Sequence, residues 1–336
     1  MDSLTHIALG ACIGELFFEK GFGKKAMIWG ALAHSIPDVD FVTALWMNTP
    51  ESLLAHRGFS HSLVFAAMII PVFSLMANKL HKPHNISFLK WNLFFTTAVL
   101  LHLFVDAFNN YGIGWFEPFN HHRFSFNIIY VADPFFSIPL FIAFLALVIS
   151  NKFQLKRKKW VSIGMTFSFL YLGYCVVNKY NADQRFKQQA IIQHIQYHDY
   201  FTTPAPLQNW LWYTVAASDT GYAVGYFSLL DKQKQIEFHY FPANHQLFKE
   251  VSDYESLHQL IRFSNGFYCI QKRNDSLIFS DLRFGQILGW RYPNNNFVFH
   301  YYLAHGVNNN LVIQKGRMMN WNIDEFRFYL KKIAGN

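Results

Sequence analysis

Four long apolar runs constrain this chain more than any other feature of its sequence. They occupy roughly residues 62–78, 91–109, 133–150 and 160–178. Each run is long enough to cross the ~30 Å hydrocarbon core of a bilayer as a helix. Lipid offers the backbone no hydrogen-bonding partner, so we expect all four to form helices.

Two weaker runs precede them, which makes about six predicted segments in all. Residues 4–18 are short and end near acidic residues, while residues 26–46 contain His34, Pro37, Asp38 and Asp40. We expect these two segments to be tilted, partly buried or re-entrant. An acid at position 2 and the lack of a basic residue before Lys20 predict that no signal peptide is cleaved.

The apolar runs are confined to the first half of the chain. Of the 336 residues, 52% are hydrophobic and only 15% are charged. We therefore predict a mainly α fold, with a membrane-embedded helical bundle over residues 1–179 and a small extracytoplasmic α+β domain over residues 180–336. Three scattered cysteines indicate neither a disulfide framework nor a cysteine-based zinc site.

Basic residues predict the orientation of the bundle, because Lys and Arg in short loops favour the cytoplasm. The loops on one side hold Lys20, Lys24, Lys25, Lys79, Lys82, Lys90, Lys152, Lys156, Arg157, Lys158 and Lys159. The opposite loops, 37–61 and 110–130, hold only Arg57 and Arg123. We therefore expect a multi-pass protein of a bacterial inner membrane whose C-terminal domain faces the periplasm. The net charge of +8 then reflects loop anchors and does not indicate nucleic-acid binding.

Histidines and aspartates converge on the predicted outer face. They are His6, His34, Asp38, Asp40, His56, His61, His102, Asp106, His121, His122 and Asp133. In "HLFVD", His102 and Asp106 share a helix face at i and i+4 and can bind one ion or flank two. The alternative is a structural hydrogen-bonded pair. Ionisable groups within membrane segments usually have a functional partner, which favours an ion site.

Two loops add further candidate ligands. "HSIPDVD" leaves the helix at Pro37; its two aspartates either both bind a cation, or one binds while the other orients a histidine, and the alternative is a polar helix cap. In "HRGFSH", Gly58 permits a sharp turn, Arg57 offers donors to an anion, and Ser60 is expected to cap a helix that opens at His61 or Ser62. The alternative for this loop is a purely interfacial role.

The candidate ligands are nitrogen and carboxylate oxygen, without thiolate. This set suits one or two divalent ions in a hydrolytic site, Zn foremost and Mn or Fe as alternatives. Such an ion lowers the pKa of bound water, and Arg57 can stabilise negative charge that develops on the attacked group.

The segments "MDSLTHIALGACIG", "IPDVD", "HRGFSHSL", "HLFVDAFNNYGIGWFEPF" and "ADPFF", in this order, resemble the bacterial inner-membrane metal-dependent hydrolases related to YdjM. The resemblance covers residues 1 to about 180, and two later stretches are similar to an exterior domain found in one branch of that family. It implies a site that comprises His6, Asp38, Asp40, His56, Arg57, His61, His102 and Asp106. His34 is not carried over from the family and is read as an interface or site residue with equal weight.

The N-terminal Thr-His and the His-x-x-x-Asp pair also resemble, more distantly, the zinc-dependent phospholipase C and P1 nuclease group. That resemblance implies a phosphoester substrate in or near the membrane. A second His-x-x-x-Glu helix is missing, so one or two ions are expected rather than three.

The C-terminal region predicts an antiparallel sheet. Alternating strands are expected at 222–229, 236–241, 267–272 and 276–284, with turns at "DTG" and "KRND" and a helix over about 245–263. The cluster of Asp281, Arg283 and Gly285 is read as a strand end with an ion pair, and contact with the membrane site is the alternative.

The leading hypothesis is a membrane metal-dependent hydrolase that cleaves a phosphoester or ester of a lipid-like or amphiphilic substrate at the outer leaflet. Its predicted ligands are His6, Asp38, Asp40, His56, His61, His102 and Asp106, and its predicted catalytic residues are Arg57, Asp40 and Asp106. Asp40 is either a ligand or an orienting residue. The rival hypotheses are a metal-ion or proton transporter, since buried His and Asp also mark ion paths, and a non-catalytic membrane scaffold.

Overall fold

The computed structural model describes residues 1–18, 22–81, 86–150, 156–233, 235–273, 276–303 and 320–335. The predicted basic residues Lys20, Lys82 and Lys152 lie outside these ranges. The chain forms two compact units. The bundle unit comprises Met1–Leu45, Ala55–Phe126 and Val131–Tyr174, and the sheet unit comprises Trp46–Leu54, Asn127–Tyr130 and Cys175–Asn336.

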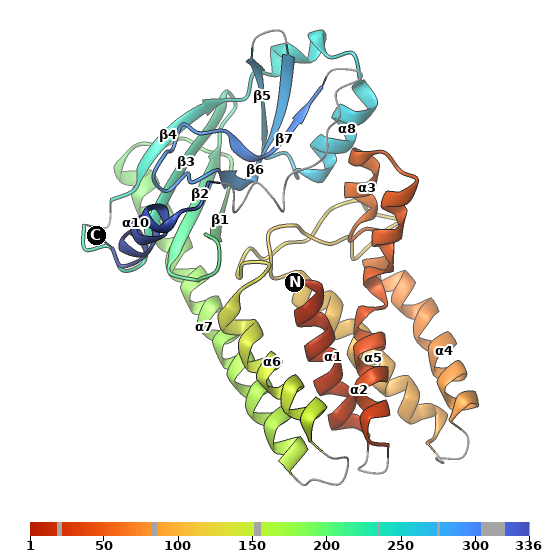
Figure 1. The fold of residues 1–336 in the computed structure, drawn as a ribbon. Coiled ribbons are helices and arrows are strands. Elements are labelled where there is room, and N and C mark those ends of the chain that lie inside the picture. The colour runs from red at the N-terminus through yellow and green to blue at the C-terminus, as the bar shows by residue number, and fades with distance from the viewer. Residues whose placement is uncertain are drawn as a thin grey trace. The chain divides into compact units, whose positions relative to one another are not determined.

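Six helices run along the bundle unit (Figure 1): α1 (Ser3–Phe17), α2 (Lys24–Ser35), α4 (Leu63–Leu80), α5 (Phe88–Asp106), α6 (Pro134–Ile149) and the first part of α7 (Lys156–Ile192). In the chain, the short helices η1 (Pro37–Leu45), α3 (Thr49–Ala55) and η2 (Phe59–His61) follow α2 and precede α4. Most of α3 belongs to the sheet unit. Among the described residues, α4, α5 and α7 are long and apolar enough to cross a membrane, while α1 and α6 are shorter apolar helices. Six crossings remain a prediction.

One local expectation is confirmed and one is wrong. The helix within residues 26–46 ends before Pro37 as predicted, since α2 ends at Ser35 and the chain continues as η1 from Pro37. Ser60 does not cap a helix. Ser62 caps α4 by accepting a hydrogen bond from Phe65 N at 3.0 Å, while the Ser60 hydroxyl donates to Asp40 at 2.8 Å.

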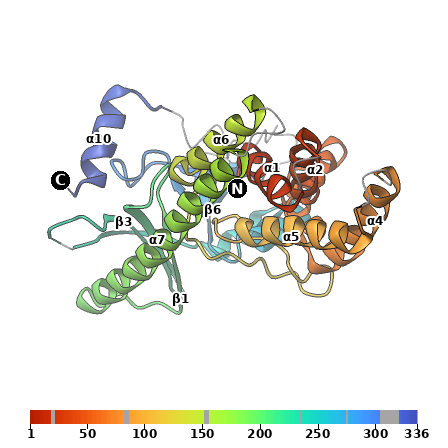
Figure 2. The ribbon, with the colours of Figure 1, turned by 90° about the horizontal axis from the view of Figure 1, so that it is seen from below.

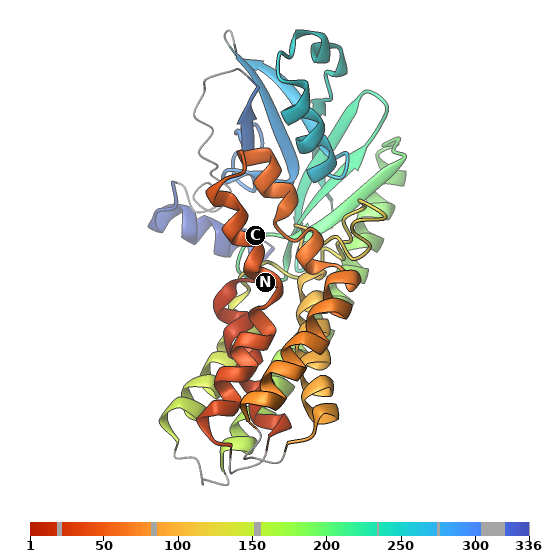
Figure 3. The ribbon, with the colours of Figure 1, turned by 90° about the vertical axis from the view of Figure 1, so that its right-hand side faces the viewer.

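A seam of small residues brings α1 and α2 into backbone contact. Gly10 and Gly14 lie on the face of α1 that meets Gly30 of α2, and any side chain at these glycines would overlap the facing backbone. Such close approach is typical of small-residue spacing in membrane helices. His6 lies four residues before Gly10, and His34 lies four residues after Gly30, so the same faces carry both rings to one end of the seam. Figure 3 shows α1 and α2, coloured red, side by side.

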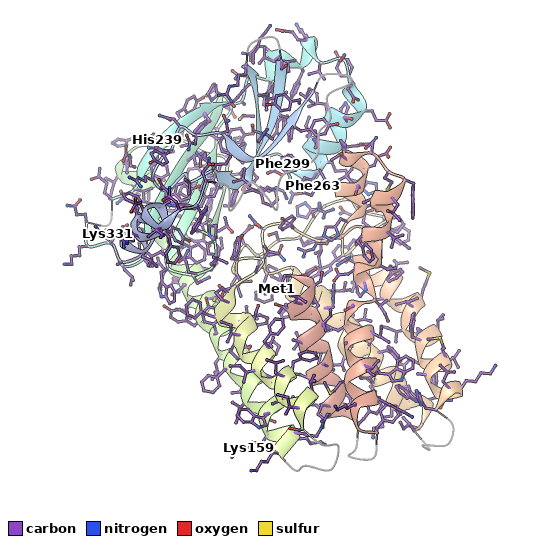
Figure 4. All side chains as sticks on the ribbon, in the orientation of Figure 1. Met1, Lys159, His239, Phe263, Phe299 and Lys331 are labelled. Carbon is purple, nitrogen blue, oxygen red and sulfur yellow. The ribbon has the colours of Figure 1, made fainter. Side chains whose placement is uncertain are left out.

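The two ends of the bundle differ in charge. Met1 and Lys159 lie at opposite ends (Figure 4). The starts of α1, α4 and α6 and the ends of α2 and α5 lie at the Met1 end (Figure 1). The helix ends nearer Lys159 carry the other described basic residues of the predicted inner loops: Lys24, Lys25, Lys79, Lys90, Lys156, Arg157 and Lys158. The predicted segregation of His/Asp clusters from basic anchors is therefore present in the bundle.

The sheet unit contains two antiparallel sheets rather than one. The first has the order β1 (Asp199–Pro204), β2 (Leu211–Ala217), β3 (Gly221–Ser228), β4 (Glu237–Pro242). The second has the order β5 (Tyr268–Arg273), β6 (Ser276–Gln286), β7 (Phe297–Tyr302). Within the described residues, the helices η4 (His245–Glu250), α8 (Tyr254–Phe263) and α10 (Ile323–Ile333) accompany them, together with the second part of α7 and most of α3. The four predicted strands and the helical stretch are confirmed, whereas β1, β2, β7 and α10 were not predicted.

Helix α7 is longer than the predicted 160–178 segment. It continues to Ile192 because Ala182, Phe186 and Ala190 form an apolar stripe at i, i+4 and i+8 that packs against the first sheet. Figure 2 shows α7 beside the strands of this sheet. In the second sheet, Asp281 and Arg283 form a buried ion pair at 2.6 Å, as predicted, next to a register shift in β6.

Candidate metal centre

Six histidine and aspartate side chains meet at the Met1 end of the bundle unit. His6 comes from α1, His34 from the last turn of α2, Asp38 from η1, His61 from η2, and His102 and Asp106 from the last turns of α5. They make two groups that share His102. We call Asp38, His61, His102 and Asp106 the mixed group, and His6, His34 and His102 the three-histidine group. Within each group, one ligand atom per residue lies within 4.8 Å of all the others.

The mixed group is compact and largely shielded from solvent. His61 Nε2 lies 3.2 Å from His102 Nε2, 3.5 Å from Asp106 Oδ2 and 3.6 Å from Asp38 Oδ1. The His61, His102 and Asp106 side chains are fully buried, and Asp38 is 20% exposed. Two imidazole nitrogens and two carboxylate oxygens therefore lie around a common point. These four atoms form a donor set that Zn, Mn or Fe can bind.

Asp40 lies behind this group and orients His61. It accepts hydrogen bonds from Arg57 N at 2.7 Å, Ser60 Oγ at 2.8 Å and His56 Nδ1 at 3.0 Å. His61 Nδ1 lies 3.3 Å from Asp40 Oδ2 and 3.0 Å from Ser60 Oγ, so Asp40 and Ser60 hold this nitrogen together. Burial alone would raise the pKa of Asp40, but the hydrogen bonds from His56 and His61 outweigh burial and lower that pKa below its ordinary value. A carboxylate that holds Nδ1–H of a histidine leaves Nε2 as the lone pair that faces the ion position. Of the two predicted roles for Asp40, the geometry favours the orienting one.

Arg57 is held in place by several contacts. Its backbone has a φ of 59°, a left-handed conformation that is uncommon outside glycine, whereas Gly58, where the turn was predicted, has a negative φ. The guanidinium donates to Asn109 Oδ1 at 2.9 Å and to Met1 O at 3.0 Å, and its Nε lies 3.2 Å from Asp106 Oδ2. These contacts show that Arg57 positions Asp106. The role of Arg57 in stabilising a substrate anion stays a prediction.

Not every predicted residue enters the two groups. His56 is 41% exposed, binds Asp40 and belongs to neither group. His121 pairs with Glu117 on an exposed loop, and Asp133 caps α6 by accepting from Phe135 N. Conversely, His34 enters the three-histidine group, and Met1 places its α-amino group against Asp106. The sequence signal for His34 was its position four residues before Asp38. The contacts of Asn109 and Met1 had no sequence signal.

The residues fit a bound cation. Buried polar atoms in proteins almost always have hydrogen-bond partners. Here His6 Nδ1, His34 Nε2 and His102 Nδ1 are buried without a hydrogen bond, and Asp106 Oδ2 is buried with an ion pair to Arg57 Nε at 3.2 Å but no hydrogen bond. Several buried ligand atoms without hydrogen bonds in one cluster are the pattern expected where an ion is the missing partner. The described cysteines, Cys12, Cys175 and Cys269, take no part.

Apolar helices and this cluster define a helical membrane protein with a candidate cation site. The family model described as "YdjM inner membrane protein" matches residues 1–182, and the chain belongs to that family of inner membrane proteins. The match covers the bundle and ends within α7, before the sheets begin. The predicted family membership is therefore confirmed, while the more distant resemblance to phospholipase C and P1 nuclease stays a prediction.

Two curated relatives are similar to this chain. The uncharacterized protein YfhP of Bacillus subtilis is 31% identical over 197 residues, which cover 53% of each chain. The inner membrane protein YbcI of Escherichia coli is 29% identical over 123 residues, which cover 36% of this chain and 69% of YbcI. The chain thus spans about half the length of YfhP. No solved structure matches the chain.

Proposed function

We propose that this membrane protein is a metal-dependent hydrolase that cleaves a phosphoester or ester bond in an amphiphilic substrate. The proposal rests on the mixed group, in which two imidazoles and two carboxylates lie close together and Asp40 contacts the far side of the His61 ring. A divalent ion held there supplies Lewis acidity, which activates water and polarises the bond to be cleaved.

The chain's own residues would divide the remaining work. Asp106 and Asp38 would offset the charge of the cation, and Asp106, fixed by Arg57 at 3.2 Å, can hold a proton that leaves the attacking water. Arg57 lies within reach of the same position, so its guanidinium would also stabilise negative charge on the substrate. His61 and His102, which are both buried, would bind the ion and keep bulk water away.

The surroundings support a lipid-like substrate. Val39, Phe41 and Leu45 of η1 interleave with Asp38 and Asp40, and their side chains are exposed. Exposed apolar side chains beside an ion site would place that site against acyl chains or headgroups. Together with the charge segregation of the bundle, they support an outer-leaflet site that faces the periplasm.

Transport is less well supported. A transporter needs polar groups that continue toward the other side of the membrane. Within the described residues of α1, the buried side chains between the cluster and the far end are Ala8, Leu9, Ala11, Cys12 and Ile13, until Glu15, which is paired with Arg157 at 2.7 Å. That pair satisfies itself and offers no open ligand.

The test uses the full chain in detergent or nanodiscs, loaded with Zn, Mn or Fe, and a panel of short-chain phospholipids and generic phosphodiesters. We expect metal-dependent hydrolysis that a chelator abolishes. Asp106→Asn, which keeps the shape of the side chain, should reduce the rate at least about 100-fold. His121→Ala removes an exposed loop histidine and should leave the rate unchanged.

Three results would contradict the proposal. Metal content that is unchanged in His61→Ala, His102→Ala and Asp106→Ala variants would remove the site. Metal flux in proteoliposomes without hydrolysis would favour a transporter. Wild-type activity in all three variants would favour a scaffold with a structural polar cluster.

A further inference from the structure

We propose that His6, His34 and His102 form a second divalent-cation position, and that the His102 ring connects it to the mixed group. This inference rests on the proposed function, because it assigns a second ion to the same site. It adds His34, a residue that the family resemblance did not supply.

The first argument is the pattern of satisfied and unsatisfied nitrogens. His34 Nδ1 lies 2.7 Å from Ala98 O, and His6 Nε2 lies 3.0 Å from Asp106 Oδ1. Both acceptors require a ring N–H, which leaves His34 Nε2 and His6 Nδ1 as lone pairs. These are the two atoms that lack any hydrogen bond. A ligating histidine typically holds its other ring nitrogen against a carbonyl or carboxylate in this way.

The second argument is the position of His102. Its Nε2 faces the mixed group, 3.2 Å from His61 Nε2 and 3.7 Å from Asp38 Oδ1, while its Nδ1 is buried without a hydrogen bond. Its ring is stacked on His6 at 4.0 Å between centroids and lies 5.2 Å from the ring of His34. The ring thus contacts the mixed group through Nε2 and lies against both other rings of the three-histidine group, with Nδ1 left as the nitrogen available to a second ion. When both positions are filled, the remaining ring proton of His102 passes to water, as proton release accompanies metal binding.

The third argument is energetic. Each buried polar atom without a partner destabilises a fold, because it loses its hydrogen bonds to water and gains none. Three such nitrogens come from three different helices, and the close contact at Gly10 and Gly30 packs two of their rings together. Without an ion, this arrangement would destabilise the helix packing. A cation removes all three penalties at once. Three histidines with an open fourth position are a known donor set for zinc.

Metal stoichiometry tests the proposal on the full chain, equilibrated with zinc alone and measured by elemental analysis. We expect two ions per wild-type chain. His34→Leu, which removes the donor but fills the space, should bind one, His61→Ala should bind one, and His102→Ala should bind fewer than one. His81→Ala is the matched control, because His81 is a bundle histidine bonded to Trp29, outside both groups, and it should retain two.

X-ray absorption of zinc-loaded His61→Ala provides a second readout, which does not depend on the folding of a His34 variant. The remaining ion should show three imidazole nitrogens at about 2.0–2.1 Å. One ion per wild-type chain, unchanged by His34→Leu, would overturn the inference even if hydrolysis is observed. Two ions with the predicted losses, but no hydrolysis of any ester, would uphold it and count against the proposed function.

Discussion

The bundle unit buries two polar centres at its opposite ends, and they differ in how their polar atoms are satisfied. At the far end, Arg157 Nε and Nη2 donate to the two carboxylate oxygens of Glu15 at 2.9 and 2.7 Å. Its Nη1 donates to Leu147 O at 2.8 Å and to Ser150 O at 3.0 Å. At the Met1 end, four donor atoms of the His/Asp cluster lack a hydrogen bond. The first centre is satisfied by protein atoms alone, whereas the second leaves ligand atoms without hydrogen bonds, which is why we propose an ion there.

The largest effect is expected from breaking the completed centre. Glu15→Ala leaves a buried guanidinium without its counter-charge and should lower the free energy of unfolding by about 3–5 kcal/mol. Metal content should not change, because Glu15 belongs to neither the mixed group nor the three-histidine group. Denaturant unfolding in detergent and elemental analysis measure the two quantities. The double variant Glu15→Leu/Arg157→Met should recover most of the stability; equal losses in the single and double variants would contradict the ion-pair account.

Asp133 offers a third case, because it is a buried carboxylate that accepts hydrogen bonds from Tyr171 Oη and from the backbone N–H groups of Phe135 and Phe136. Burial raises its pKa to about 6. The folded state then binds the proton more tightly than the unfolded state does. The free energy of unfolding is therefore highest below about pH 4 and falls by up to about 3 kcal/mol as the pH rises through about 6. Asp133→Asn should flatten thermal unfolding against pH, whereas Asp219→Asn, at an exposed site, should not.

The open centre should lose affinity when a ligand is removed. His61→Ala takes one nitrogen from the mixed group and should weaken ion binding there at least about 100-fold, measured by competition with a chelator. Stability in the absence of metal should change little compared with Glu15→Ala. Unaltered affinity would mean that the cluster is structural, like the centre at the far end.

A smaller effect is expected for Asp40→Asn. The substitution leaves the ligand atoms in place but removes the charge that holds His61 Nδ1, so affinity should fall about 10–100-fold. The same chelator competition, with His121→Ala as the control, measures it. A fall as large as that of His61→Ala would show that Asp40 is itself a ligand, the other of its two predicted roles.

Much of the fold followed from the sequence, because long apolar runs and alternating strands carry their own periodicity. The runs that became α4, α5, α6 and α7, and strands β3 to β6, were predicted at nearly their final places. The unexpected elements have weaker local signals: β1 and β2 are buried on both faces without polar alternation, and α7 extends beyond its apolar run through contacts with the first sheet. Those contacts depend on residues far apart in the chain.

From the amino-acid sequence we could name the candidate ligands, since residue type, spacing and the family resemblance all pointed to His6, Asp38, His61, His102 and Asp106. How these side chains are arranged became clear from the packing of the helices. It placed Asp40 behind His61, left His56 outside both groups, and brought in His34. The physical reason is that ligand roles depend on which ring nitrogen is already hydrogen-bonded, and those partners, such as Ala98 O, come from other helices through packing that local sequence does not encode.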